Sequence, residues 1–544
     1  MKTMKKYITG LLVMLSSTFV LAQESAQPTK IPCTKNYYNN DYLYRNNFWL
    51  QGNNAAGLIF NDKILNAVNV YSQFEGTVAH SDGSYRNIFT PVSEQEYQLN
   101  ALSYMNLDKV YLYGNFTYDY TFKRDVQWHG MLNPYTSPFM MSDSVPGNQL
   151  LERFSFVAGI ALPLSKYFSA GVYMDYTALR AAKQRDLRNE NTYMNLLIRP
   201  GVLFHYNKWK LGLNFMYEKT TELIEYKEWD ENTSKTVFYI NGLWFYTYEI
   251  YSISVDARRR KHDDRLGGAF QLEFTTGDFS YYNEFSASYC DGFLSEKGYN
   301  NKQYGDTEIA GFRYDGKISY KNKHRLTGFL DISSMLGYKF IQRSALDPTS
   351  GTNQWTTYDR VNSYVRNAVE YEAAYTFDQP RNECNNEWSL TAGIKGYTIE
   401  NAYKIYPLKY VQQWNYTETF ATFNKNLLLK SGMLDINPNL SYGWGNGVMN
   451  DKRTMNGMTI EEVEEYMPPT EQAWQLLEPL AAEFAFMTAD HLNVGIHCRY
   501  TYFLNKKTGY NLYGDFRYNY VYALSDVLKD THRNYFSLTV GLSF

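Results

Sequence analysis

Hydrophobic and polar residues alternate strictly in the last ten residues of the chain, YFSLTVGLSF. Phe536, Leu538, Val540, Leu542 and Phe544 occupy every second position, and small or polar residues stand between them. Successive side chains of a β-strand point to opposite sides of the sheet. The segment therefore predicts a strand with one apolar face and one polar face.

The same alternation recurs along the chain, for example in residues 110–123, 168–176, 195–205, 209–218 and 491–500. Such stretches are about 9 to 14 residues long, which suits tilted strands that cross a bilayer. Short turns punctuate them at Asn106–Asp108, Thr276–Asp278, Lys321–Lys323 and Thr488–Asp490. We expect about 18 strands, within a range of about 16 to 20.

Two all-β folds would explain this alternation: a soluble β-sandwich and a transmembrane antiparallel β-barrel. The composition favours the barrel, because 52 tyrosines and 32 phenylalanines occur in a chain that is hydrophilic overall. An open sheet edge cannot face lipid, so the strands must close on themselves. The segment Val237–Val255 can be counted as a wall strand or left out. Counting back from Phe544 places the turn at Thr488–Asp490 outside the cell, whereas its shortness would place it in the periplasm.

The first residues predict export. Lys2, Lys5 and Lys6 precede a short apolar run, and Ala22 stands where a signal peptide is cleaved. A short N-terminal anchor is the alternative, but the run falls short of the roughly 20 residues of a spanning helix. The predicted organisation is a signal peptide at 1–22, a periplasmic or plug segment at 23–62, and the barrel at 63–544. Cleavage leaves 50 Lys+Arg against 56 Asp+Glu, a balance that gives no reason to expect nucleic acid as a partner.

Three resemblances add to this interpretation. The final strand resembles the C-terminal strand of bacterial outer-membrane barrels, which ends on an aromatic residue; this implies recognition by the barrel-assembly machinery and closure against an early strand. The stretch from Asn53 and Asn54 through Ala55 to Gly57 is similar to the "NPAGL" motif of fatty-acid-transporter-like (FadL-like) barrels, with Ala55 in place of the proline. That similarity implies an N-terminal hatch in the lumen. The whole mature chain resembles uncharacterised Bacteroidota outer-membrane barrels of the domain-of-unknown-function kind.

The polar face of the predicted strands carries charges of both signs. A lumen of this kind is wettable and weakly selective, and it lacks the continuous apolar path that a long fatty acid would need. The same charges would equally suit a lumen that is braced by ion pairs and conducts nothing. The lumen-facing candidates are Asp119, Lys123, Asp175, Arg199, Lys210, Glu218, Glu273, Glu284, Arg499, Asp515 and Arg517.

Motifs for catalysis and metal binding are weak. The eight histidines are scattered, and His491 and His497 share a face with Arg499 but have no nearby acidic pair, so we expect no metal. No local nucleophile motif supports an enzyme, and no cofactor is expected. The run ARRRKHDDR, with Arg258 to Arg260, predicts a solvated loop with internal ion pairs. Its alternative is a site for lipopolysaccharide phosphates or an anion-favouring constriction.

Two further features are an acidic stretch near the C-terminus and four separated cysteines. The acidic stretch that begins at Thr459 and ends before Pro468 predicts a short helix in a long loop, in preference to a calcium site. Cys33, Cys290, Cys384 and Cys498 lie far apart, and one pair could close in an oxidising compartment.

Three functions follow for a barrel integral to the outer membrane, in contact with its lipid and lipopolysaccharide. The first is a channel or transporter for small polar or amphipathic solutes. The second is a non-conducting accessory barrel that partners a TonB-dependent transporter or a surface lipoprotein. The third is an outer-membrane hydrolase. A plug domain of the size that energised transporters use is not seen, so the chain is not interpreted as that transporter itself.

Overall fold

The computed structural model describes residues 36, 38–61, 70–227, 235–251, 257–296, 302–404, 410–449, 474–505 and 509–544. The predicted signal peptide and the predicted helix at Thr459 lie outside these residues. Among the described residues, no helix is long and apolar enough to cross a membrane.

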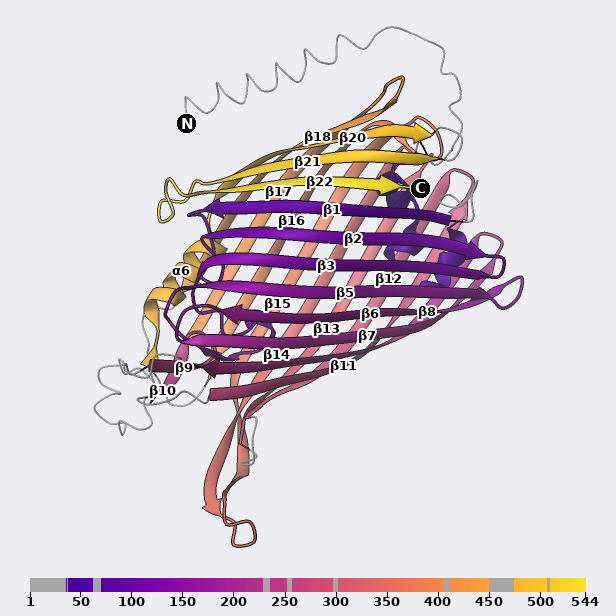
Figure 1. Cartoon of the computed structure of the whole chain (residues 1–544). Helices are drawn as coiled ribbons and strands as arrows, with labels where there is room; N and C mark the ends of the chain where they lie inside the picture. The colour runs from indigo at the N-terminus through magenta and orange to yellow at the C-terminus, as the bar shows by residue number, and fades with distance from the viewer. Residues whose placement is uncertain are drawn as a thin grey trace.

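Eighteen antiparallel strands form one closed sheet, which confirms the predicted barrel (Figure 1). Each strand pairs with its neighbours in the wall, and β22 pairs with β1 to close the ring. The wall strands are β1 (Val70–Gly83), β2 (Ser93–Leu107), β3 (Val110–Val126), β5 (Gly147–Pro163), β6 (Phe168–Lys183), β7 (Arg188–Tyr206), β8 (Trp209–Lys227), β11 (Ala257–Thr276), β12 (Phe279–Glu296), β13 (Gln303–Tyr320), β14 (His324–Leu346), β15 (Asn353–Pro380), β16 (Asn386–Tyr403), β17 (Tyr410–Leu428), β18 (Gly432–Met449), β20 (His491–Asn505), β21 (Tyr510–Ala523) and β22 (His532–Ser543).

The apolar face of each strand points outward. On β8, Leu213 and Phe215 are 58% and 51% exposed, whereas Asn214 between them is 5% exposed and faces the lumen. The same parity holds on β22, where Leu538 and Val540 are exposed and Ser537 is buried. This inside-out arrangement suits a wall whose outer surface meets lipid.

The two ends of the barrel differ. The backbone of Phe544 exchanges hydrogen bonds with that of Ser72 at 2.8 and 2.9 Å, so the barrel begins and finishes at one end, which we call the terminal end. Most turns at this end are short and use left-handed residues such as Asp108 (φ 55°) and Asn207 (φ 52°). The opposite end, which we call the loop end, carries the long connections.

A second sheet folds over the loop end. Its strands are β4 (Phe139–Ser142), β9 (Lys235–Asn241), β10 (Phe245–Tyr251) and β19 (Trp474–Gln475), paired in the order β19-β10-β9-β4. The short helix η3 (Pro134–Thr136) and helix α6 (Leu477–Met487) lie beside it. We call this sheet together with α6 the cap. The cap explains why two ways of counting strands place the turn at Thr488–Asp490 on different sides of the membrane. β9 and β10 alternate like wall strands but belong to the cap. The turn at Thr488–Asp490 follows α6 and lies at the loop end.

The N-terminal segment lies inside the barrel near the terminal end (Figure 1). We call residues 38–61 the hatch. It contains α2 (Asn40–Asn46), α3 (Phe48–Gln51) and the 3-10 helix η2 (Ala55–Phe60). The side chains of Asn39, Asn47 and Asn54 each accept a backbone N–H at the start of one of these helices. Asparagine is among the best residues for this capping role, which explains why three short helices form in so brief a segment.

Two further features complete the fold. Beyond Lys339 and before Tyr364, β14 and β15 pair only with each other, and this ribbon extends past the wall (Figure 1). Cys384, in the turn between β15 and β16, is disulfide-bonded, whereas Cys290 and Cys498 are free thiols. The remaining cysteine, Cys33, lies outside the described residues.

Candidate functional site

The hatch rests on a part of the wall where four neighbouring strands each place a glycine toward the lumen. Gly159, Gly171, Gly201 and Gly212 stand on β5, β6, β7 and β8 and face the lumen beneath η2. A Cβ atom at Gly171 would lie 2.6 Å from the backbone nitrogen of Ala56, and one at Gly159 would lie 3.0 Å from the Leu58 side chain. We call these four glycines the seat, because their lack of side chains lets the hatch backbone approach the wall closely.

Two asparagines of the predicted plug motif bind the wall beside the seat. The Asn54 side chain donates hydrogen bonds to the carbonyl oxygens of Val202 (2.9 Å) and Leu213 (3.3 Å). The Asn214 side chain donates to the Asn53 carbonyl at 2.8 Å, and Asn53 also donates to the Glu284 carboxylate. The motif therefore attaches the hatch to β7, β8 and β12 through polar groups.

A tryptophan completes this attachment. The Trp49 indole N–H donates to the Glu273 carboxylate, which also accepts from Lys210 at 3.0 Å. Gly57 approaches Trp49 closely, and Trp49 meets Tyr282 edge-on with ring centroids 5.5 Å apart. Both Glu273 and Glu284 are buried, so each carboxylate is held by hydrogen bonds and not by bulk water.

The cap is attached differently, through one large apolar core. Trp244 of the cap stacks on Phe89 (ring centroids 5.4 Å apart), and Phe245 stacks on Tyr403 of β16 (4.0 Å). Inward side chains of several wall strands join this core, so the cap lies across the lumen. The buried residues are Trp128, Met131, Met140, Met141, Leu187, Ile224, Tyr226, Val237, Ile240, Leu243, Trp244, Phe245, Met335, Tyr364, Tyr403, Tyr410 and Leu480.

The basic run ARRRKHDDR takes part in this attachment. The prediction that the run forms a solvated loop is wrong. Residues 257–276 form β11, so neighbouring charges of the run point to opposite faces of the wall. Arg259 is 2% exposed, and its guanidinium lies 4.7 Å from the ring centroid of Tyr239 in the cap and 3.4 Å from that of Tyr304. The buried Lys261 pairs with Asp263 and donates to Thr136 at 3.1 Å.

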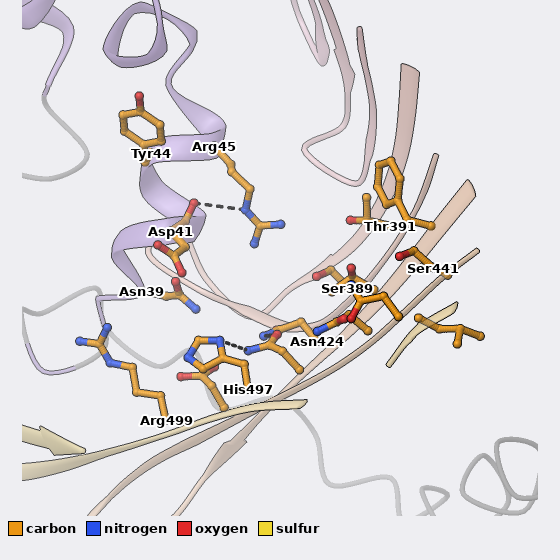
Figure 2. Close-up of a pocket in the computed structure, with 18 of the residues that line it drawn as sticks. Asn39, Asp41, Tyr44, Arg45, Ser389, Thr391, Asn424, Ser441, His497 and Arg499 are labelled. Carbon is orange, nitrogen blue, oxygen red and sulfur yellow. Dashed lines mark hydrogen bonds between the residues drawn. The ribbon is translucent and has the colours of Figure 1, made fainter. Parts of the chain in front are cut away.

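A polar cavity of about 560 Å³ lies between the hatch and the opposite wall (Figure 2). On the hatch side it is lined by Tyr38, Asn39, Asp41, Tyr44 and Arg45. On the wall side, β16, β17, β18 and β20 contribute amide, hydroxyl and charged groups: Ser389, Thr391, Lys395, Glu418, Asn424, Asp435, Asn437, Asn439, Ser441, Asn493, His497, Arg499 and Thr501. We call this space the hatch cavity. Its volume falls within the roughly 300–1,000 Å³ of small-molecule sites.

The predicted lumen-facing residues divide into four groups. Glu273, Lys210 and Glu284 hold the hatch, as described above. Arg499 lines the hatch cavity, and Arg199 lines two smaller cavities of about 310 and 230 Å³ beside the hatch. Other members brace the wall by ion pairs: Asp119 with Arg153 (2.5 Å), Glu218 with Arg265 (3.2 Å), and Asp515 with Arg517 (3.2 Å). Lys123 and Asp175 project from the same face of β3 and β6.

The histidines that the sequence places on one face are held apart by different partners. His491 is bonded to the hydroxyl groups of Tyr85 (2.9 Å) and Tyr416 (3.2 Å), and His497 to Asp515 (2.6 Å). Among the described residues, no group of three or more His, Cys, Asp or Glu side chains is arranged to hold a metal ion.

Sequence reasoning missed the polar side chains that the hatch contributes. Asn39, Asp41 and Arg45 lie on or beside α2, a helix of seven residues that is too short to show a clear periodicity. A signal was present, because asparagines recur at positions 39, 47 and 54, each ahead of a helical turn.

The closed wall and the hatch in its lumen define a β-barrel of the outer-membrane type. The chain belongs to a family of unknown function, DUF6850, whose model matches residues 63–544. No curated protein sequence matches the chain.

Several solved outer-membrane proteins are similar in structure. The copper transporter OprC shares 9% identity at a TM-score of 0.39, over 87% of this chain and 80% of that one. The ferric yersiniabactin uptake receptor FyuA from Yersinia pestis shares 7% identity at a TM-score of 0.37, over 87% and 80%. The outer membrane transporter YddB from Escherichia coli shares 8% identity at a TM-score of 0.35, over 88% and 81%.

Proposed function

We propose that this protein is an outer-membrane transporter for small polar or amphipathic solutes, with a lumen that the hatch keeps closed at rest. The terminal end faces the periplasm, because bacterial barrels place both ends of the wall there. The observation that carries the proposal is the hatch cavity, a polar space bounded by the hatch on one side and the wall on the other. A solute in this cavity touches the element that must move for the lumen to open.

The attachment of the hatch suits such movement. Asn54 and Asn214 bind through neutral amide hydrogen bonds, which water can replace at little net cost when the hatch shifts. The charges that line the lumen make it wettable along its length. Ion pairs such as Glu218–Arg265 lie on the wall itself and do not cross the lumen.

A second function is favoured by one observation: the hatch and the cap both lie across the lumen. In this alternative the barrel conducts nothing and serves as the accessory partner of a TonB-dependent transporter or a surface lipoprotein. The alternative predicts co-purification with that partner and no solute flux.

The test is uptake of labelled small polar solutes by liposomes that contain the purified mature protein, beside a variant lacking residues 23–61. We expect slow uptake with the whole protein and fast, unselective uptake with the variant. Planar-bilayer conductance of the same two samples measures opening directly. Uptake by the variant alone would refute transport by the intact protein and support the accessory function.

A further inference from the structure

The charges around the hatch cavity fall into two classes. Those on the wall are mostly satisfied within the wall: Lys395 lies 3.3 Å from Glu418, and the Asp435 carboxylate accepts a hydrogen bond from Asn426 at 2.6 Å. His497 is likewise occupied by Asp515. These groups shape the cavity but have little capacity left for a charged ligand.

Three other charges form no close salt bridge among the described residues, although Asp41 and Arg499 attract each other across the cavity. Asp41 and Arg45 stand one turn apart on α2, where Arg45 Nε donates to the Asp41 backbone carbonyl at 3.2 Å. Among the described residues, the Asp41 carboxylate and the two terminal nitrogens of Arg45 have no hydrogen-bond partner. Across the cavity, the Arg499 guanidinium lies 3.8 Å from the ring centroid of Tyr513. Within the described part of the chain, none of these three side chains lies within 4.0 Å of an oppositely charged group. Figure 2 shows where Asp41, Arg45 and Arg499 lie around the cavity.

We propose that the hatch cavity binds a small zwitterion, such as a free α-amino acid or a short peptide. Arg45 and Arg499 hold the carboxylate, and Asp41 holds the ammonium group. This assignment rests on the proposed function, because it names the class of solute that the transporter takes.

The chemistry of the three groups selects for both charges in one molecule. A simple anion meets the Asp41 carboxylate, and a simple cation meets two guanidinium groups. A neutral sugar would displace water from all three charged groups and offer none of them an opposite charge, so its binding would be costly. A zwitterion pairs with both signs, and arginine is well suited to a carboxylate because it can offer two parallel N–H groups.

The position of these groups links binding to the hatch. Asp41 and Arg45 belong to the hatch, whereas Arg499 belongs to β20 of the wall. A bound zwitterion therefore contacts both parts at once, so its binding free energy acts directly on the position of the hatch relative to the wall.

Isothermal titration calorimetry of the full mature protein in detergent tests the proposal, with glycylglycine as the probe. N-acetylglycylglycine amide, which has the same backbone without charges, and maltose are the comparison probes. We expect glycylglycine to bind and the two neutral probes to bind at least about tenfold more weakly. The substitutions Asp41→Asn and Arg45→Gln should each weaken glycylglycine binding by about 10- to 100-fold.

Two matched variants control for general loss of lumen charge. Lys123→Gln and Glu96→Gln remove a cation and a carboxylate from the inward faces of β3 and β2, outside the hatch cavity, and should leave the affinity unchanged. Heat-modifiable migration on gels checks that every variant is folded. Equal binding of the neutral peptide, or unchanged binding by both hatch variants, would overturn the assignment.

The outcome separates this inference from the proposed function. Glycylglycine that binds but never enters liposomes would leave the site intact and refute transport. Uptake of maltose without any binding of glycylglycine would support transport and refute the zwitterion site.

Discussion

The hatch and the cap both lie across the lumen, but the wall holds the hatch through hydrogen bonds and three small apolar clusters, and the cap through one large apolar core. The hatch meets glycines and amides, buries Phe48, Trp49 and Leu58 against the wall, and borders a polar cavity. The cap shares a continuous core with β8, β14, β15, β16 and β17, and moving it would expose large aromatic surfaces. Burial of apolar area resists separation in water far more than exchangeable hydrogen bonds do. We therefore expect the hatch to move more readily than the cap, and we call them the moving and the fixed closure.

The largest expected effect tests the fixed closure. Trp244→Ala removes a ring that stacks on Phe89, meets Trp128 edge-on and donates its indole N–H to Glu483 at 2.8 Å. We expect a loss of about 3–5 kcal/mol in cap stability. In hydrogen exchange, amides of β9, β10 and α6 should lose about 100-fold or more of their protection, while hatch amides keep theirs.

The control is Trp209→Ala, which removes an exposed tryptophan from the outer surface of β8. Cap protection should stay unchanged in that variant. If Trp244→Ala loosens the hatch as much as the cap, the two closures are one cooperative unit and the comparison fails.

An intermediate effect tests the moving closure. Gly201→Ala places a methyl group against the Asn54 side chain, 2.8 Å from its Cγ, and should displace the hatch from the seat. We expect open-channel events in planar bilayers and a red shift of Trp49 fluorescence, with little change in the melting temperature of the barrel. Gly114→Ala is the matched control, since a Cβ at Gly114 meets no atom within 4 Å. Silent bilayers with both variants would contradict a movable hatch.

The smallest effect concerns the response of the cap to pH. Burial raises the pKa of the Glu483 carboxyl above its usual value of 4.5, so the folded cap binds a proton more readily than the unfolded chain. This contribution to stability is complete below about pH 4.5 and is lost as the pH rises through the raised pKa. We expect Glu483→Gln, which mimics the protonated carboxyl, to flatten the pH dependence of cap protection.

The wild type and the variant must be compared at each pH, because His129 acts in the opposite direction. Burial lowers the pKa of His129 to about 3, so its contribution to stability is lost as the pH falls below about 6.5. That contribution is common to both proteins and cancels in their difference. An unchanged pH profile in Glu483→Gln would show that folding does not shift the pKa of this carboxyl, contrary to the direction given above.

The sequence predicts the wall well because a strand in a barrel has only two environments. Leu213 and Asn214 differ in hydropathy, and that difference alone assigns their faces. The same logic fails for the cap. Val237 and Ile240 alternate with polar residues as wall strands do, and no local pattern says which sheet a strand joins.

The candidate site is only half visible in the sequence. The alternation along β20 predicts that Arg499 faces the lumen. Asp41 and Arg45 lie on a helix that is too short to show a periodic pattern. Position matters in a further way at Asn214. Alternation indicates only that Asn214 faces the lumen, whereas in the structure its amide donates a hydrogen bond to the Asn53 carbonyl at 2.8 Å. Tertiary partners of this kind cannot be read from alternation.

The place of the seat along the chain has a consequence for biogenesis. Its glycines lie on β5 to β8, and the hatch-binding carboxylates lie on β11 and β12, so all of them precede the last nine wall strands. The hatch can therefore dock onto a half-built, still open sheet. Arg325 of β14, which donates to Asn46 at 2.7 Å, and finally β22 then enclose it. This order along the chain gives a route to the closed barrel in which a folded plug is not threaded into a finished ring.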